Sequence, residues 1–442
     1  MLIVYPIRFV FYVKNFLFKG LIMKIGVIAD DFTGATDIAS FFVANGLSTV
    51  QLCKVESKTE CPKDVDVIVI SHKTRSCPVD EALTEVSKTL SWLKANNCPQ
   101  IFFKYCSTFD STTKGNIGPV TDFLMEQLNC KFTIFSPALP INGRTVYQGY
   151  LFVEDVLLSQ SGMRNHPVTP MTESNIVNLV HDQSKYKCGL INSQILDEGP
   201  ESVKSKMQDL IKKGYRYAVV DAINTKHLIT QAKAFKDLPL LTGGSGLAIG
   251  ISQVINSNYI GNIAYKYGTP NQGRGVVLSG SCSVMTNKQV AFYKQKASSK
   301  KVDIKELMKY QNNIEQLVDT YYDFILTHIN EPLAPLVYAT DDGDSLKKVL
   351  KNYGNEVSSN IEKLFFNLAK KLKVNGVNKF IVAGGETSGT ITQALDINGF
   401  YIGPSISPGV PWVKSLDGQV SLTLKSGNFG QEDFFERAQK DY

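Results

Sequence analysis

Short apolar runs rich in β-branched and aromatic residues alternate with longer amphipathic stretches along most of the chain. Nearly continuous apolar runs, separated by helix-sized segments, are typical of strands in a parallel sheet that is buried on both faces. This spacing predicts strands at residues 25–29, 65–70, 101–104, 132–135, 217–220, 276–278 and 380–383. Helices are predicted at 315–329 and 357–372, and the alternation of polar and apolar residues at 419–424 predicts a strand on the edge side of its sheet.

Residues 261–275 interrupt this pattern, because they are rich in Gly, Asn and Pro and follow no clear period. Such a composition is typical of an interdomain linker. We therefore predict two α/β domains with largely parallel sheets, at residues 23–260 and 276–442. The length of 442 residues is sufficient for two domains that each bury a core of their own.

Residues 1–22 are apolar, but Arg8, Lys14 and Lys19 interrupt them before a membrane-spanning length is reached. A secretory signal is disfavoured as well, because these charges lie inside the apolar core instead of preceding it. We expect a leader that is not part of the fold, with Met23 as the biological start. A mobile or membrane-touching extension is the alternative.

Charge and cysteine usage narrow the classes of partner. Lysine and arginine number 47 against 41 aspartates and glutamates, a net charge of +6, without the long basic blocks of a nucleic-acid-binding arm. We expect anionic small molecules as partners, no nucleic acid and no membrane, and a homo-oligomer stays open. The eight cysteines form no C-x-x-C pair, which disfavours zinc and redox motifs and favours reduced thiols in a cytoplasm.

Three glycine-rich turns follow apolar runs, at residues 243–246, 279–283 and 384–389. A strand-to-helix turn of this kind either binds phosphate with its backbone N–H groups or is a plain connection. No G-x-x-x-x-G-K-[ST] motif occurs, and no acid follows Gly246 until Asp303, so a P-loop and an NAD site are disfavoured. All charges between Asp237 and Asp303 are cationic, which favours a polyphosphate ligand; a solvated basic helix face is the alternative.

Polar side chains that suit a sugar acid follow the first predicted strand and several later turns. Asp30 and Asp31 end that strand, at the edge of the sheet where ligands bind in open α/β folds. A carboxylate there accepts hydrogen bonds from substrate hydroxyls or takes a hydroxyl proton, and capping of the next helix is the alternative. Further candidates are Arg75, Lys114, Arg144 and His166. Arginine forks suit a carboxylate, whereas a surface charge or a satisfied loop histidine is the plain alternative.

A series of motifs occurs in the order found in a known family. They are IADDFTGATD (28–37), DSTTKGN (110–116), SPALPINGRTVYQGYLFV (136–153), MRNHPVTPMTESN (163–175), GGSGLAIG (243–250), VLSGSCS (277–283), AGGETSG (383–389) and LKSGNFG (424–430). On these motifs the chain from Met23 to Phe435 resembles the four-carbon acid sugar kinase family, and within it the 3-oxo-tetronate kinases. The resemblance implies an N-terminal domain that binds the sugar acid, a C-terminal domain that binds ATP, and phosphoryl transfer with Mg²⁺ in the cleft between them.

The same resemblance implies roles for individual residues. The nucleotide would contact Ser281, Ser283, Gly384, Gly385, Glu386, Thr387 and Gly427. The sugar acid would contact Asp30, Asp31, Arg75, Lys114, Arg144 and His166, with Asp31 as the base or as the carboxylate that orients the hydroxyl. Lys114 stands where members of the family often carry arginine, and lysine lacks the bidentate fork.

The implied reaction is ATP-dependent phosphorylation of the terminal C4 hydroxyl of a four-carbon sugar acid, with 3-oxo-tetronate as the first choice of acceptor. Threonate or erythronate is the alternative acceptor within the family. A sugar-acid-binding sensor without catalysis and a dehydrogenase are the alternatives from other classes. Turnover of ATP with a tetronate separates the kinase from both.

Overall fold

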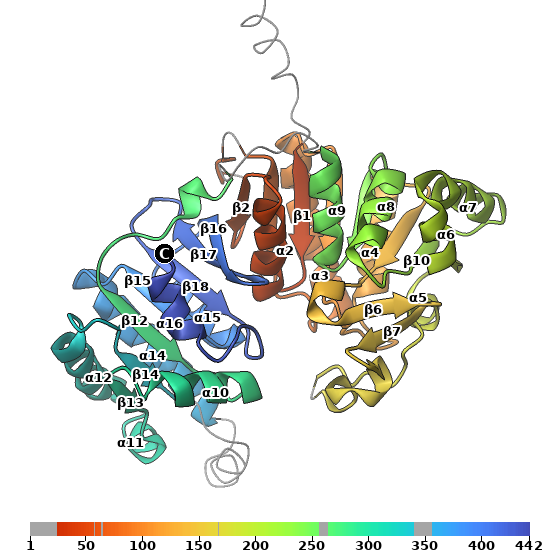
Figure 1. Ribbon diagram of the computed structural model, residues 1–442. Helices are drawn as coiled ribbons and strands as arrows, with labels where there is room; N and C mark the ends of the chain where they lie inside the picture. The colour runs from red at the N-terminus through yellow and green to blue at the C-terminus, as the bar shows by residue number, and fades with distance from the viewer. Residues whose placement is uncertain (1–23, 57, 63–64, 167, 256–263, 340–355) are drawn as a thin grey trace, which may run out of the picture.

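The computed structural model describes residues 24–442 except 57, 63–64, 167, 256–263 and 340–355. The predicted leader, the predicted start at Met23 and the beginning of the predicted linker therefore lie outside the described residues. One continuous sheet of 15 strands runs through two lobes, which Figure 1 shows side by side. Residues 24–255 are called the N-terminal lobe here, and residues 264–442 the C-terminal lobe.

The N-terminal part of the sheet is entirely parallel. Its strands lie in the order β2 (Thr49–Leu52), β3 (Val67–Ser71), β1 (Ile25–Ala29), β4 (Gln100–Lys104), β11 (Leu240–Gly243), β5 (Thr133–Ser136), β10 (Tyr217–Val220) and β9 (Cys188–Ile191). Strands β1, β3 and β4 are buried along their whole length, as expected for strands that helices cover on both faces. The apolar runs thus predicted β1, β3, β4, β5 and β10, whereas β2, β9 and β11 were not predicted.

The C-terminal part is parallel at one end and antiparallel at the other. Its order is β13 (Ser299–Lys301), β14 (Leu336–Tyr338), β12 (Gly275–Ser279), β15 (Lys379–Ala383), β18 (Ser421–Lys425), β17 (Val410–Ser415) and β16 (Gly399–Ser407). Strands β17 and β16 run antiparallel to their neighbours, and β16 pairs antiparallel with β2 of the N-terminal lobe. The α/β class with a largely parallel sheet is confirmed, and the pairing of β16 with β2 joins the two parts into one sheet.

The predicted edge-side position of residues 419–424 is wrong. Strand β18 contains residues 421–424 of this segment and lies between β15 and β17, with every residue of the strand buried. Its polar residues Ser421 and Thr423 are fully buried and not exposed to solvent. Small hydroxyl side chains inside a sheet mimic the alternation of a half-exposed strand.

Helices flank the sheet on both faces (Figure 1). The N-terminal lobe contains α2 (Phe32–Ala44), α3 (Val79–Ala95), α4 (Ile117–Gln127), α5 (Ile176–Gln183), α6 (Ser193–Glu198), α7 (Pro200–Lys212), α8 (Thr225–Phe235) and α9 (Gly246–Ile255). The C-terminal lobe contains α10 (Val284–Tyr293), α11 (Ile304–Lys309), α12 (Ile314–His328), α14 (Glu356–Val374), α15 (Gly385–Ala394) and α16 (Phe434–Lys440). None of the helices described is both long and apolar enough to cross a bilayer.

Two smaller features shape the region between the lobes. A separate antiparallel sheet of β6 (Arg144–Tyr147), β7 (Tyr150–Val153) and β8 (Val156–Leu157) forms the lower part of the N-terminal lobe in Figure 1. The β16–β17 hairpin is irregular, with register shifts between Ile402 and Ser407. Such irregularities bend a strand. The turn of this hairpin reaches helix α2, where Gly409 lies against Asp37.

The described part of the predicted linker packs against the C-terminal lobe. A short 3₁₀ helix at Lys266–Gly268 crosses β16 so closely that a methyl group on Gly403 would overlap the carbonyl oxygen of Gly268. Asn271 donates backbone and side-chain hydrogen bonds to the strand β18 region, including one of 2.8 Å to Ser421 Oγ. This stretch is therefore a fixed strap on the lobe.

We expect Gly403→Ala to lower the free energy of unfolding by about 1–3 kcal/mol, because the added methyl group must displace backbone atoms. Urea unfolding of the full chain measures this. Gly389→Ala is the matched control: Gly389 lies within helix α15 with open space around its Cα, so alanine there should be neutral or stabilising by up to about 1 kcal/mol. Equal unfolding midpoints for the two variants would contradict the close crossing.

Candidate active site

The carboxylates after strand β1 surround one guanidinium group. Asp30 is buried and accepts two hydrogen bonds from Arg75, each of 2.9 Å, from Nε and Nη2. Arg75 Nη2 also lies 2.9 Å from Asp31 Oδ1, and Nη1 lies 3.7 Å from Asp110 Oδ2. Arg75 therefore fixes the loop that carries Asp30 and Asp31, which we call the acidic loop. Because Asp30 occupies the fork of Nε and Nη2, this fork does not offer a bidentate site to a ligand.

Asp31 is the cap of helix α2, the alternative that the sequence left open, and it also lines a cavity. It caps helix α2, because its Oδ1 accepts a hydrogen bond of 2.9 Å from the backbone N–H of Gly34. Its Oδ2 accepts another, of 3.1 Å, from the hydroxyl of Thr33. Burial opposes ionisation, but the charges of Arg75 and Lys104 and these hydrogen bonds outweigh it and hold the pKa of Asp31 below its ordinary value. Asp31 also lines a cavity between the lobes.

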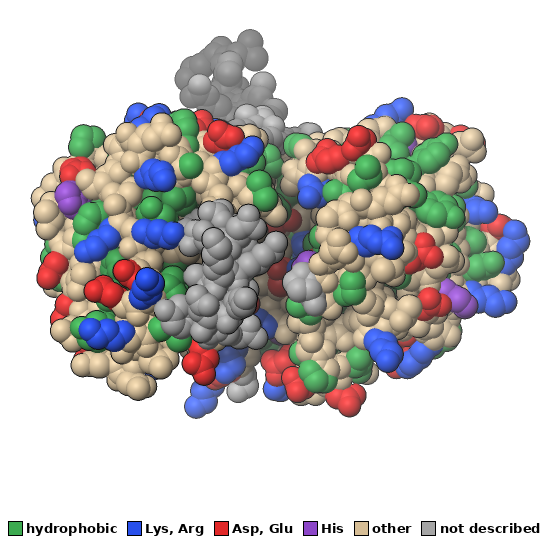
Figure 2. Space-filling model, turned by 90° about the horizontal axis from the view of Figure 1, so that it is seen from below, with side chains coloured by type: hydrophobic (Ala, Val, Ile, Leu, Met, Phe, Trp, Pro, Cys, Tyr) green, Lys and Arg blue, Asp and Glu red, His purple; other side chains and the backbone are tan. Residues whose placement is uncertain are grey.

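That interlobe cleft has a volume of about 370 Å³, and both lobes contribute to it. Figure 2 shows the furrow between the lobes with acidic and basic side chains inside it. The charged and titratable lining residues of the N-terminal lobe are Asp31, Asp37, Arg75, Lys104, Cys106, Asp110, Arg144 and His166. The C-terminal lobe adds Gly409 from the β16–β17 turn and residues 426–429 after β18. The cleft thus brings most of the predicted substrate residues together with predicted nucleotide residue Gly427.

Lys104 is a cleft residue that the sequence analysis missed. It ends strand β4 and is 2 % exposed, and its Nζ lies close to Gly34 at the start of α2. Its charge acts on both Asp31 and Asp37. A buried ammonium that lines a cleft suits an anionic ligand. In the sequence, Lys104 is simply the polar residue that ends an apolar run, so no local pattern marks it as a binding residue.

Of the other predicted substrate residues, two line the cleft and one does not. Arg144 and His166 line the cleft. Arg144 donates from Nη1 to the carbonyl of Asn142, while its buried Nε has no hydrogen-bond partner. His166 Nδ1 accepts a hydrogen bond of 3.0 Å from the backbone of Thr169, as a satisfied loop histidine does. Lys114 is exposed and is not among the residues that line the cleft.

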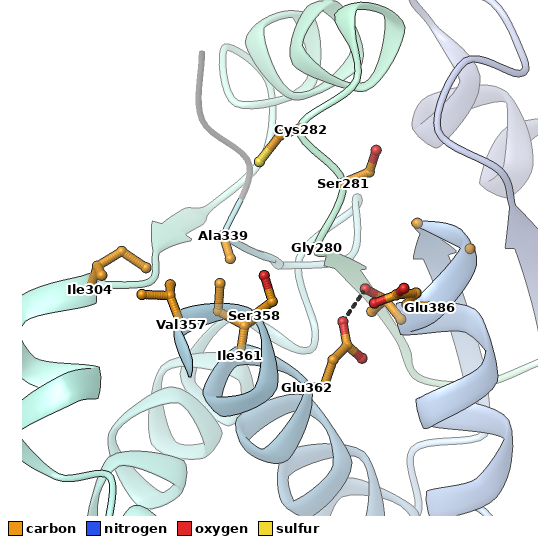
Figure 3. A pocket seen from close by; sticks show the side chains of 13 residues that line it. Gly280, Ser281, Cys282, Ile304, Ala339, Val357, Ser358, Ile361, Glu362 and Glu386 are labelled. Atoms are coloured by element: carbon orange, nitrogen blue, oxygen red, sulfur yellow. Dashed lines mark hydrogen bonds between the residues drawn. The ribbon is translucent and has the colours of Figure 1, made fainter. Parts of the chain in front are cut away.

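A second cavity, of about 240 Å³, lies in the C-terminal lobe where β12 and β15 end (Figure 3). Residues 280–282, after β12, and 384–387, at the start of α15, line it from two sides. Ser283 caps helix α10 by accepting a hydrogen bond from Thr286 N–H, so two helix N-termini converge here. The positive ends of these helices and their free backbone N–H groups form a cradle for an anion.

Gly427 closes the cradle and belongs to the cleft as well. A Cβ at this position would lie 2.8 Å from Ser281 Oγ and 2.9 Å from Ser283, so only glycine lets the turn after β18 approach the two serines. Ser281 lines the cradle cavity and Gly427 lines the interlobe cleft. The two cavities therefore adjoin at these residues.

The other sequence features that suggested an anion site behave differently. The turn at 243–246 packs against the backbone of residues 136–138, and its Ser245 hydroxyl donates to Asp37. Lys288 and Lys296 of the cationic window pair with Glu432 and Glu436 on the surface, as in the solvated alternative. The cradle itself lies next to a different cation.

Lys425 is that cation, and the sequence analysis missed it too. It ends β18 with 0 % exposure, and its Nζ donates to the carbonyls of Ser426 and Gly427 at 3.0 and 2.8 Å and to Thr286 Oγ1 at 2.9 Å. Burial lowers the pKa of Lys425 to about 7. The ammonium group thus ties the Gly427 turn to helix α10 and places positive charge beneath the cradle.

Two carboxylates line the cradle cavity, on α14 and α15. Glu362 Oε1 accepts a hydrogen bond of 3.0 Å from Thr387 Oγ1, drawn dashed in Figure 3, whereas its buried Oε2 has no partner. Burial raises the pKa of Glu362. Glu386 lies in the first turn of α15, near the hydrogen bond between Thr387 and Glu362 (Figure 3). The described residues contain no group of three or more His, Cys, Asp or Glu side chains that could enclose a metal ion.

Comparison with known proteins agrees with this layout. Residues 25–251 match the family model of a sugar-binding N-terminal domain, and residues 276–435 match that of a nucleotide-binding C-terminal domain. Proteins of Pectobacterium atrosepticum and Escherichia coli, both described as 3-oxo-tetronate kinases, are 52% and 54% identical to this chain, over 95% and 87% of it and 99% of each relative. The chain belongs to the 3-oxo-tetronate kinase family.

Solved structures similar to this member of the 3-oxo-tetronate kinase family share its whole fold. A protein from Salmonella typhimurium superposes with a TM-score of 0.89 at 52% identity, over 95% of this chain and 100% of that one. A protein from Haemophilus influenzae superposes with a TM-score of 0.80 at 51% identity, over 94% and 99%. The acidic loop and Lys104 lie in the segment that matches the sugar-binding model, and the cradle lies in the segment that matches the nucleotide-binding model.

We expect nucleotide binding at pH 8 to take up as much as about one proton. Burial lowers the pKa of Lys425 to about 7, so the amine is largely neutral at pH 8, and a bound polyphosphate favours the ammonium form and raises that pKa. Calorimetric titration with ATP in buffers of different ionisation enthalpy measures the uptake.

Lys425→Met should abolish this uptake. Lys379→Met is the matched control, because burial also lowers the pKa of Lys379, which begins strand β15 at the end remote from the cradle. Equal uptake by wild type and Lys425→Met would contradict the assignment.

Proposed function

We propose that the chain is an ATP-dependent kinase that phosphorylates the C4 hydroxyl of 3-oxo-tetronate. The observation that carries the proposal is the junction at Gly427, where a charged cleft adjoins an anion cradle, in a chain whose relatives are described as 3-oxo-tetronate kinases. Transfer between two small molecules requires that their sites meet in this way. The free thiols of all eight cysteines are in keeping with a reducing compartment, and we propose the cytoplasm.

The sugar acid is proposed to bind in the interlobe cleft. Lys104 and Arg144 are the cations available for its carboxylate, because Arg75 is engaged by Asp30. Asp31 is proposed to orient the hydroxyl groups, and His166 to contact the acid through the nitrogen that does not face Thr169. Asp30 and Arg75 act by holding Asp31 in place. Lys114 stays a predicted contact, although it lies outside the cleft lining.

ATP is proposed to bind in the cradle. Backbone N–H groups of residues 384–387 and the hydroxyls of Ser281 and Ser283 would hold its phosphates, with Gly427 at the end that faces the sugar acid. The carboxylates Glu362 and Glu386 would hold Mg²⁺ together with phosphate oxygens, and the orphaned Oε2 of Glu362 fits this use. Bound Mg²⁺ neutralises the charge that develops on the phosphates.

Catalysis then depends mainly on position. The C4 hydroxyl must lie in line with the bond between the γ-phosphorus and the leaving oxygen. Because the two ligands are held by different lobes, closure of the cleft completes the site and excludes water, which limits hydrolysis of ATP. Residues 426–429 and the Gly409 turn are the parts of the C-terminal lobe that meet the acid.

We expect ADP release from ATP and Mg²⁺ with 3-oxo-tetronate, in a coupled assay over a panel that includes threonate and erythronate. Faster turnover of threonate or erythronate would reassign the acceptor, and no ADP release with any acid would leave a binding protein and sink the kinase proposal. Asp31→Asn should lower kcat/KM for the acid about 100-fold, because the charge of an orienting carboxylate is lost while the asparagine oxygen can still cap helix α2.

Gly385→Val should raise KM for ATP at least about tenfold, because a branched side chain would fill the cradle mouth. The exposed Asp237→Asn is the matched control for the aspartate, and Gly389→Ala is the control for the glycine. Turnover left intact in both Asp31→Asn and Gly385→Val would contradict the site assignment.

A further inference from the structure

Asp31 is poorly suited to accept a proton. Its oxygens already face three donors: the N–H of Gly34, the hydroxyl of Thr33 and the guanidinium of Arg75. The pKa of this carboxyl is held below its ordinary value, which makes it a weak base. A base for the C4 hydroxyl should instead have a free oxygen in the cleft and a raised pKa.

Asp37 has both properties. It follows Asp31 by six residues, lies within helix α2 and lines the interlobe cleft. Its Oδ2 accepts a hydrogen bond from the hydroxyl of Ser245 at the start of α9, which fixes the carboxylate plane. Its Oδ1 is buried and receives no hydrogen bond. An orphaned carboxylate oxygen is costly in a folded protein and indicates a partner that arrives with a ligand.

The surroundings of Asp37 come from both lobes. Burial, together with the charge of Asp31 at the N-cap of α2, raises the pKa of Asp37 and outweighs Lys104 on β4 and Arg144 on β6, which favour its charged form. The C-terminal lobe faces Oδ1 with the uncharged Gly409 and Phe429. A Cβ on Gly409 would overlap Oδ1, so this turn reaches the carboxylate only because it carries glycine. The oxygen without a partner therefore lies at the seam where acid and nucleotide would meet.

We propose that Asp37 is the catalytic base, which accepts the proton of the C4 hydroxyl on Oδ1 during transfer. This inference rests on the proposed kinase function and deepens it. The hydroxyl oxygen forms a bond to the γ-phosphorus while the bond from that phosphorus to the β-γ bridging oxygen breaks. The electron pair of the broken bond leaves with ADP. The hydroxyl proton passes to Asp37 and is released to water after the products depart.

The test compares Asp37→Asn with Asp31→Asn on the acid that the wild type turns over best. Asp37→Asn should lower kcat about 100-fold or more, with KM for ATP and for the acid changed less than about threefold. The acidic limb of the wild-type profile of kcat/KM against pH should disappear in Asp37→Asn and persist in Asp31→Asn, where KM for the acid rises. Thermal unfolding and ATP titration confirm that each variant is folded.

Ser245→Ala supplies a second readout that leaves the base in place. The hydrogen bond from Ser245 favours the charged form of Asp37, so its loss should move the acidic limb to higher pH with little change of the plateau. An Asp37→Asn enzyme within tenfold of wild type, or an unmoved limb in Ser245→Ala, would overturn the role of Asp37 alone. A wild-type protein that turns over no acid would overturn the kinase proposal, and the role of Asp37 with it.

Discussion

The pairing of β16 with β2 is the constraint on which the rest of the molecule depends. Two parallel sheets that each end in ligand-binding turns would have no fixed relation if a loop alone joined them. Backbone hydrogen bonds from Gly399–Tyr401 to Val50–Leu52 instead make one sheet of both. The irregular hairpin that continues from this seam carries Gly409 to helix α2 and sets the end of β18 beside the acidic loop.

The cations on the two sides of this seam differ in whether a carboxylate pairs with them directly. The charge of Arg75 is balanced by the carboxylates of Asp30, Asp31 and Asp110, so this side chain stabilises the loop that carries Asp30 and Asp31. Lys104 and Lys425 are more deeply buried than Arg75, and no direct ion pair joins either of them to a carboxylate among the described residues. The charges of Asp31 and Asp37 act on Lys104 from a distance, whereas burial lowers the pKa of Lys425 to about 7. Buried amines without a directly paired carboxylate, on either side of one junction, support the anionic ligands proposed for both cavities.

The sequence predicted the parallel framework because the apolar runs are long and continuous, as in β1, β4 and β15. It did not predict β16 and β17, whose glycines and prolines resemble loops, and the partner of β16, strand β2, is hundreds of residues away in the chain. The turn motifs placed the cradle and the acidic loop, since helix starts are local features. Lys104 and Lys425 stayed hidden because burial at a strand end depends on neighbours that only the fold supplies.

Three neighbouring aspartates show why residue type alone does not decide a role. Asp30, Asp31 and Asp37 lie within eight residues and look equivalent as side chains. Both oxygens of Asp30 accept hydrogen bonds from Arg75. The oxygens of Asp31 face the N–H of Gly34, the hydroxyl of Thr33 and the guanidinium of Arg75. Oδ1 of Asp37 receives no hydrogen bond. Asp37 thus has the fewest donors, and this supports its proposed role as proton acceptor, because a carboxylate takes up a proton more readily when fewer donors stabilise its charge. Burial raises the pKa of Asp30 as well, but Arg75 holds both of its oxygens, so Asp30 has no oxygen left for a substrate hydroxyl.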